Sequence, residues 1–170
     1  TDIETFYRAI NKVHPSYKRV EADEVTYNLH IMLRLEIEKE ILSGQIKVAQ
    51  LEEVWNERMR EYLGITPPNS SEGVLQDIHW SAALFGYFPN YALGEALAAQ
   101  LFERATTDDT AILPALSKGD FKPYFAWVKP RIHEQASLKS FDDLVVAATG
   151  EKLSAAALKR HLKKRYLEEP

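Results

Sequence analysis

The fold is decided by residues 25–44, which read VTYNLHIMLRLEIEKEILSG. Apolar side chains recur there every four residues, at Val25, Leu29, Leu33, Ile37 and Ile41. That spacing places them on one face of an α-helix, and Gly44 stands where a glycine commonly ends a helix. The pattern predicts a helix over residues 23–43, the longest in the chain.

Apolar residues at spacings of three and four also dominate the rest of the sequence, whereas alternating strand patterns and Asn-Gly hairpin signals are missing. Residues 65–73 form the clearest loop, and a bend is expected at Pro130. The further predicted helices cover residues 2–13, 51–63, 89–105, 109–117, 121–135, 140–148 and 154–167. The sequence therefore predicts an all-α fold, with residues 1–170 as a single helical region.

The composition excludes several classes of protein. The chain has 170 residues, 45% of them apolar and 27% charged, which is typical of a globular domain. With no cysteine it has no disulfide, no thiol nucleophile and no Cys-ligated zinc. The net charge of −4 argues against a nucleic-acid partner, and no apolar run approaches a membrane span. We expect a cytoplasmic protein, and a chain that starts at Thr1 suggests a processed or excised piece.

No self-contained metal site is predicted. None of the five histidines is paired as His-x-x-x-His, and none follows a glutamate by three residues. Glu36 and Glu40 share one face of the longest predicted helix, where a solvated surface is the better interpretation. Phosphate-binding glycine loops and a Gly-x-Ser-x-Gly elbow are also missing.

Two short segments carry a more specific signal. Residues 73–80, GVLQDIHW, contain the pattern Gly-x-x-Gln-Asp-x-His-Trp, and residues 18–23, KRVEAD, contain Arg-x-x-Ala-Asp. Both resemble signatures of the carboxypeptidase Taq family of zinc metallocarboxypeptidases, although Lys18 stands where that family usually has an aliphatic residue. The similarity runs from about Phe6 to Leu101, most clearly through residues 21–30, 61–64 and 85–94.

The resemblance implies a function for a longer protein. Enzymes of this family are nearly all-helical and roughly three times longer than this chain, and they hold zinc with two histidines of a His-Glu-x-x-His helix and a later glutamate. Because those ligands are not in this sequence, we expect a C-terminal fragment that is inactive alone. The complete protein would remove single residues from peptide C-termini as a homodimer. The partners of this chain would be the peptide C-terminus and the missing N-terminal part of the protein.

The resemblance also implies roles for individual residues. Arg19 is the candidate to hold the substrate carboxylate, because a guanidinium offers charge and two parallel hydrogen bonds. His79 and either Tyr87 or Tyr91 are candidates to donate to the developing oxyanion. Two further residues, Gln76 and Asp77, are expected to orient His79 or the substrate backbone.

Each role has a competing interpretation. Arg19 would instead pair with Glu21 or Asp23, His79 would be a core histidine, and one tyrosine would only pack. Asp23 is more naturally a helix cap than a catalytic group. The rival to the enzyme is a stand-alone helical module that binds peptides or acts as a scaffold. In the enzyme, Gln76, Asp77, His79 and Arg19 would share an open groove, and apolar surface would be left exposed for the missing part.

Overall fold

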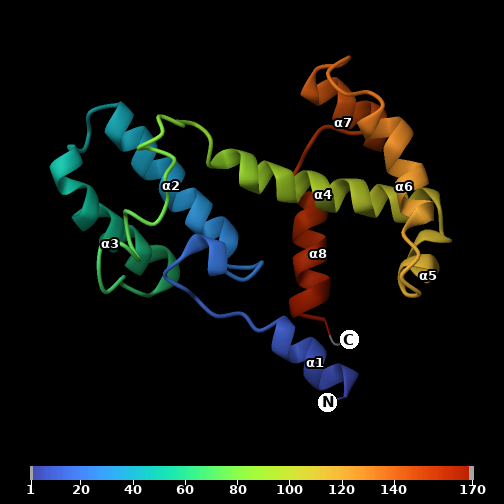
Figure 1. The fold of residues 1–170 in the computed structure, drawn as a ribbon, viewed down its shortest axis with the longest axis horizontal. Helices are drawn as coiled ribbons and strands as arrows, with labels where there is room; N and C mark the ends of the chain where they lie inside the picture. Colours follow the sequence, from blue (N-terminus) through green and yellow to red (C-terminus); the bar gives the residue numbers. More distant parts are fainter. Residues whose placement is uncertain (1, 169–170) are drawn as a thin grey trace. The chain divides into compact units, whose positions relative to one another are not determined.

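The computed structural model describes residues 2–168, and this part of the chain is helical with no β-strand. The eight α-helices are α1 (Ile3–Ile10), α2 (Tyr27–Leu42), α3 (Leu51–Leu63), α4 (Pro89–Asp108), α5 (Ile112–Leu116), α6 (Lys122–Val128), α7 (Phe141–Thr149) and α8 (Ala156–Tyr166) (Figure 1). Short 3₁₀ turns cover Arg19–Glu21 and Val48–Gln50, and a π turn covers Lys129–His133. The all-α prediction is confirmed.

The chain divides into two compact units, one up to Ala92 and the other from Leu93 on. The boundary falls inside α4, so the two units share one continuous helix. The prediction of a single helical region stays a prediction. No helix in the described part of the chain has the length and apolar character to cross a membrane.

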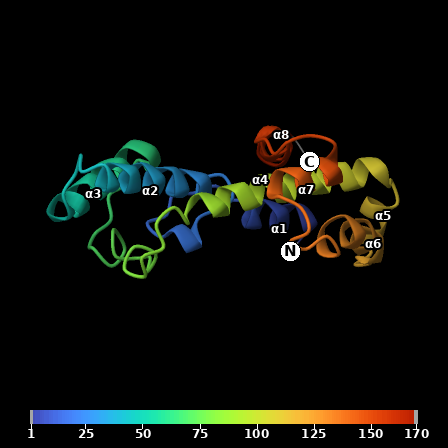
Figure 2. The ribbon, with the colours of Figure 1, turned by 90° about the horizontal axis from the view of Figure 1, so that it is seen from above.

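The core of the first unit lies between α2 and α3, which run side by side (Figures 1 and 2). Its buried members are Leu33, Ile37, Trp55, Met59 and Leu63. On each helix these residues are four apart, so the apolar spacing in the sequence becomes the packed face. The helix α3 ends where Gly64 takes a left-handed conformation with φ of 71°.

Helix α2 begins later than predicted, at Tyr27 instead of residue 23. The reason is Asp23, whose carboxylate accepts hydrogen bonds from the backbone N–H groups of Val25 and Thr26 at 2.9 Å. These bonds fold the preceding residues into a turn that leads into the helix. The Asp23 carboxylate thus caps this turn, whereas the N-cap of α2 itself is Thr26, which makes no side-chain capping hydrogen bond.

Helix α1 is amphipathic but buries none of its residues. Asp2 caps it by accepting from the Thr5 backbone N–H at 2.8 Å. Its apolar side chains are open to solvent, with Ile3 87%, Phe6 58% and Ile10 64% exposed. Exposed apolar surface is thus present, and the interpretation that a missing part of the protein covers it stays a prediction.

The second unit has its own core. The buried residues are Leu101, Ala105, Ile112, Trp127, Val128 and Ala148. The predicted bend at Pro130 takes the form of the π turn Lys129–His133, because proline has no N–H for the regular helical hydrogen bond. Helix α5 starts at Ile112 and not at residue 109, since Asp109 accepts from the Ala111 N–H at 2.9 Å and forms a turn first.

Two neighbouring residues of α2, one buried and one exposed, allow a test of the packing between α2 and α3. Leu33 is fully buried and Met32 is 50% exposed. We expect Leu33→Ala to lower the free energy of unfolding by about 2–5 kcal/mol, because it leaves a cavity between α2 and α3. Met32→Ala, the matched control, should change it by less than about 0.5 kcal/mol. Urea denaturation of both variants measures the difference, and equal effects would contradict the packing described above.

Candidate functional site

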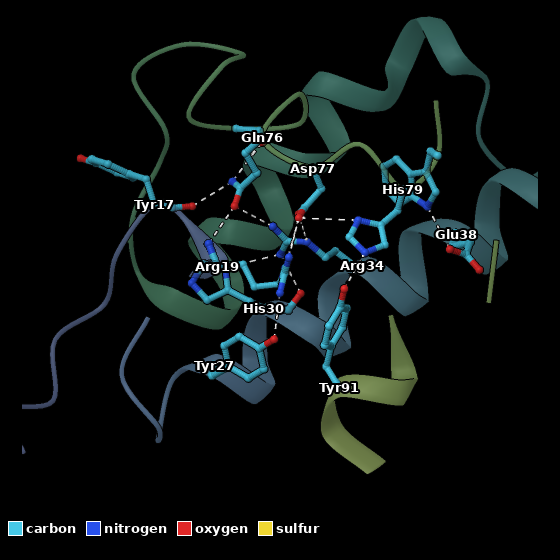
Figure 3. Close-up of polar contacts among 12 residues, drawn as sticks. Tyr17, Arg19, Tyr27, His30, Arg34, Glu38, Gln76, Asp77, His79 and Tyr91 are labelled. Carbon is cyan, nitrogen blue, oxygen red and sulfur yellow. Dashed lines mark hydrogen bonds and ion pairs between the residues drawn. The ribbon is translucent and has the colours of Figure 1, made fainter. Parts of the chain in front are cut away.

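The centre of the first unit holds one carboxylate between two guanidinium groups. Asp77 Oδ2 accepts from Arg34 Nε at 2.7 Å, and Asp77 Oδ1 accepts from Arg19 Nη2 at 2.8 Å and from Arg19 Nε at 3.2 Å (Figure 3). Arg34 comes from α2, Arg19 from a 3₁₀ turn and Asp77 from the loop before α4. Three segments that are distant in sequence therefore meet at one carboxylate.

Gln76 makes a second junction beside Asp77. Its Oε1 accepts from the Arg19 backbone N–H and from Arg34 Nη2, both at 2.8 Å. Its Nε2 donates to the backbone oxygen atoms of Tyr17, Glu72 and Gly73. All of these partners belong to the chain itself, which favours the orienting role for Gln76 over direct contact with a substrate.

Arg34 is a component that the sequence analysis missed. Its side chain is completely buried, and its guanidinium lies 4.6 Å from the centroid of the Trp55 ring. Nη1 donates to the backbone oxygen of His30 at 2.8 Å. A signal was available, because His30, Arg34 and Glu38 recur every four residues and so form one polar stripe along α2.

Glu38, the last member of this stripe, holds the aromatic loop. Its carboxylate accepts from Trp80 Nε1 at 2.9 Å and from the backbone N–H of Gly86. Gly86 has φ of 76°, a left-handed conformation that a side chain would disfavour. The loop residue Phe88 is buried, and the centroid of its ring lies 4.3 Å from the centroid of the His79 ring. Glu38 therefore fixes the loop that surrounds His79.

His79 connects Asp77 to Tyr91. Its Nε2 lies 2.9 Å from the Tyr91 hydroxyl, and its Nδ1 lies 3.8 Å from Asp77 Oδ1 (Figure 3). Tyr91 comes from the first turns of α4. The centroid of the Tyr87 ring lies 5.6 Å from the ring centroids of both His79 and Tyr91. Tyr87 is 42% exposed.

Arg19 lies between the carboxylate and the tyrosines. Besides its bonds to Asp77, its Nη1 donates to the Tyr27 hydroxyl at 2.8 Å, and its guanidinium lies 4.7 Å from the centroid of the Tyr91 ring. The predicted alternatives for Arg19 are wrong, because Glu21 pairs with Lys18 at 3.9 Å and the Asp23 carboxylate binds the turn before α2. The expected groove is less open than predicted, since Arg19 and His79 are each only 7% exposed.

The charges of this cluster are uneven. Burial would raise the pKa of Asp77, but the hydrogen bonds and charges of Arg19 and Arg34 outweigh it and lower that pKa below its ordinary value. Burial, with the two arginines, lowers the pKa of His79. Burial and the charge of Arg34 lower the pKa of His30 to about 4. At Asp77 two cations therefore face one carboxylate, so the excess of positive charge is local to the two arginines. The buried carboxylate of Glu38 instead accepts from Trp80 and Gly86.

The described residues offer no ligand set for a metal ion. In residues 2–168 no three His, Cys, Asp or Glu side chains converge as a metal site requires. The site assembles Arg19, Gln76, Asp77, His79 and Tyr91, with Tyr87 at its edge. Its chemistry is that of charge and hydrogen bonding: it can attract an anion and donate to or accept from a ligand.

Comparisons with known proteins agree on one family. The sequence profile described as carboxypeptidase Taq (M32) metallopeptidase matches residues 1–166. The chain is 44% identical over 164 residues to thermostable carboxypeptidase 1 of Thermus thermophilus, which covers 96% of this chain and 32% of that protein. It is also 44% identical to carboxypeptidase 1 of Bacillus subtilis, with 96% and 33% covered.

Solved structures give the same result. Metallocarboxypeptidase 1 of Trypanosoma cruzi matches with a TM-score of 0.92 and 39% identity, over 97% of this chain and 35% of that one. The M32 carboxypeptidase of Deinococcus radiodurans matches with a TM-score of 0.90 and 32% identity, over 96% and 33%. The chain thus spans about a third of the length of the relatives it matches.

The pKa of His30 predicts how stability depends on pH. Its pKa is about 4 in the folded chain against an ordinary value of 6.5, so the unfolded chain binds more protons between these limits. We expect the free energy of unfolding to fall by on the order of 3 kcal/mol from this residue as the pH drops from about 7 to about 4. Urea denaturation across that range measures it.

The variant His30→Gln should show a shallower pH dependence than the wild-type chain. His79 acts in the same direction because its pKa is also lowered, so some dependence will remain. His133→Gln, at an exposed position, controls for the substitution itself. An unchanged slope in His30→Gln would contradict the buried, neutral state of His30.

Proposed function

Because the chain belongs to the carboxypeptidase Taq (M32) metallopeptidase family, we propose that it is the C-terminal part of a zinc-dependent carboxypeptidase that removes single residues from peptide C-termini. The observation that carries this proposal is the cluster around Asp77. It contains the candidate residues of both sequence motifs, and it holds an excess of positive charge. A site for a free C-terminal carboxylate needs such a charge.

Arg19 is the residue proposed to bind that carboxylate. A guanidinium has five N–H groups, of which three donate to Asp77 and Tyr27. Two N–H groups remain at the end of the side chain, which is the number that a carboxylate accepts in a bidentate pair. Arg34 is buried completely and holds Asp77 and Gln76. Of the two arginines, Arg19 is therefore the one suited to an external ligand.

His79, Tyr87 and Tyr91 are proposed to form the part of the site, next to Arg19, from which a hydrogen-bond donor reaches the substrate. Their rings lie within 5.8 Å of one another, and the Arg19 guanidinium covers the Tyr91 ring. Fixed polar groups at this position would stabilise charge that develops on the scissile carbonyl. Asp77 is proposed to orient His79, whose Nδ1 lies 3.8 Å from Asp77 Oδ1, and Gln76 to hold Arg19 and Arg34 through the bonds described above.

The metal does not belong to this chain in the proposal. The described residues do not fit a metal ligand set, so zinc would be held by the remaining part of the protein, and this chain alone would be inactive. The resemblance to the family also underlies the proposed homodimer and the cytoplasmic location. The rival function, a stand-alone peptide-binding or scaffold module, would need the same anion site but no metal-bearing part. The coding sequence upstream of Thr1 separates the two.

Titration with zinc tests whether the metal ligands lie outside this chain. We expect the 170-residue chain to bind zinc no more tightly than about micromolar, because a tight site needs three or four convergent ligands. Isothermal titration calorimetry measures this affinity. A stoichiometric nanomolar site would contradict the proposal that the metal ligands lie elsewhere.

Substitution of Arg19 tests the carboxylate site in the longer protein that we propose. Arg19→Ala should remove most of the preference for a free over an amidated C-terminus, because the guanidinium anchors the charged form only. The measurement compares kcat/KM for the two peptides. Lys18→Ala, at the neighbouring exposed position, is the matched control and should keep the preference.

Arg19→Ala also leaves Asp77 with one cation, so the variant has a folding risk. Arg19→Lys keeps the charge and removes the bidentate geometry. It should fold and still lose about tenfold or more in kcat/KM for the free C-terminus, a loss of at least about 1.4 kcal/mol. If both variants retain the preference for the free carboxylate, the anchor lies elsewhere.

A further inference from the structure

The hydrogen bond between His79 and Tyr91 allows two placements of its proton. Nε2 and the Tyr91 hydroxyl are 2.9 Å apart, and either atom can be the donor. If Tyr91 donates to Nε2, its oxygen offers only lone pairs to a ligand. If Nε2–H donates to Tyr91, the tyrosine keeps its own O–H for a ligand. The two placements therefore give the site opposite hydrogen-bonding character.

The surroundings of the other ring nitrogen of His79, Nδ1, decide between the two placements of the proton. Nδ1 lies 3.8 Å from Asp77 Oδ1, and both side chains are about nine-tenths buried, at 9% and 10% exposed. Nδ1 is shielded from water and has no hydrogen-bond partner among the described residues. A lone pair on Nδ1 would face an anionic oxygen and be repelled, whereas an N–H there is attracted to it.

The surrounding charges keep this arrangement in place. Asp77 stays ionised because Arg19 and Arg34 both donate to it. No guanidinium N–H supplies a donor to Nδ1, because Nδ1 has no hydrogen-bond partner among the described residues. His79 is neutral at pH 7, since burial lowers its pKa, and a neutral ring carries a single N–H.

We propose that His79 carries its proton on Nδ1, that Tyr91 therefore donates its O–H to His79, and that Tyr87 supplies the hydroxyl that donates to the substrate. This inference rests on the proposed function, because the substrate to which Tyr87 donates is the peptide of that proposal. It makes His79 a positioning residue for Tyr91, and it separates the roles of two tyrosines that the sequence could not distinguish.

The surroundings of Tyr87 fit this role. Within residues 2–168 its hydroxyl takes part in no hydrogen bond, and the residue is 42% exposed, so the O–H remains available. Its backbone is fixed by the preceding Gly86, whose N–H donates to the buried Glu38. Tyr91, in contrast, is held on two sides, by His79 at its hydroxyl and by the Arg19 guanidinium over its ring.

The proton on His79 can be observed directly in the 170-residue chain. Two-bond ¹⁵N–¹H correlation spectra of the uniformly ¹⁵N-labelled protein at pH 7 distinguish a protonated from an unprotonated ring nitrogen. We expect Nδ1 of His79 to be protonated and Nε2 unprotonated, with His79→Gln used to assign the signals. A proton on Nε2, or a ring that averages between both forms, would overturn the proposal.

His30 is an internal control with the opposite expectation. Its Nδ1 lies 3.4 Å from Arg34 Nη1, and because a guanidinium only donates, this nitrogen must accept. His30 should therefore carry its proton on Nε2, and His30→Gln assigns it. The same spectrum then contains one buried histidine of each form, and a His79 signal of the His30 type would contradict the inference.

Kinetics in the longer protein test the roles of the tyrosines. Tyr87→Phe should lower kcat by about 10²–10³ with KM little changed, as for loss of an oxyanion donor. Tyr91→Phe should lower kcat less than about tenfold and leave the His79 proton on Nδ1. The reverse order of the two effects would overturn the assignment. Failure of the carboxypeptidase proposal would appear instead as an inactive wild-type protein, with the His79 spectrum unaffected.

Discussion

The carboxylate of Asp77, shared by Arg19 and Arg34, is the contact on which the rest of the first unit depends. Both ions of such a pair lose their hydration when they are buried, and removal of one partner leaves a buried charge that costs about 3–5 kcal/mol. The three groups come from a 3₁₀ turn, from α2 and from an irregular loop. No regular secondary structure joins the loop and the turn to the helix there, so they are held by this contact together with the hydrogen bonds of Gln76 and Glu38.

Helix α2 serves two purposes with two interleaved stripes. The apolar stripe packs against α3 and provides the hydrophobic stabilisation of the unit. In the polar stripe, Arg34 holds Asp77 of the loop, and Glu38 holds Trp80 and Gly86. Because both stripes repeat every four residues on one rigid element, the position of the site is fixed by the same helix that forms the core. The residues that form the core therefore also place the polar groups of the site.

The helices and the motif residues could be predicted from the sequence, but the burial of the polar stripe could not. Apolar composition and spacing, with Gly44, Gly64 and Pro89 marking helix ends, located α2, α3 and α4 to within a few residues. The motifs identified Arg19, Asp77 and His79, which do converge. Arg34 and Glu38 were missed because a charged residue on a helix normally faces solvent. Their burial depends on the loop over residues 74–88, whose irregular backbone has no periodic signal in the sequence.

The excess of positive charge at Asp77 explains why, in the proposed enzyme, this chain binds the anionic end of the substrate and another part of the protein binds the metal. A site that must both hold a metal and bind an anion needs carboxylates for the first and cations for the second, and carboxylates close to Arg19 would compete with the substrate. Here the one carboxylate in contact with Arg19, Asp77, is already shared with Arg34. That second arginine leaves Arg19 with part of its charge unmatched, next to two tyrosines and a neutral histidine. Arg34 therefore allows a buried carboxylate to orient His79 without cancelling the attraction of Arg19 for an anion.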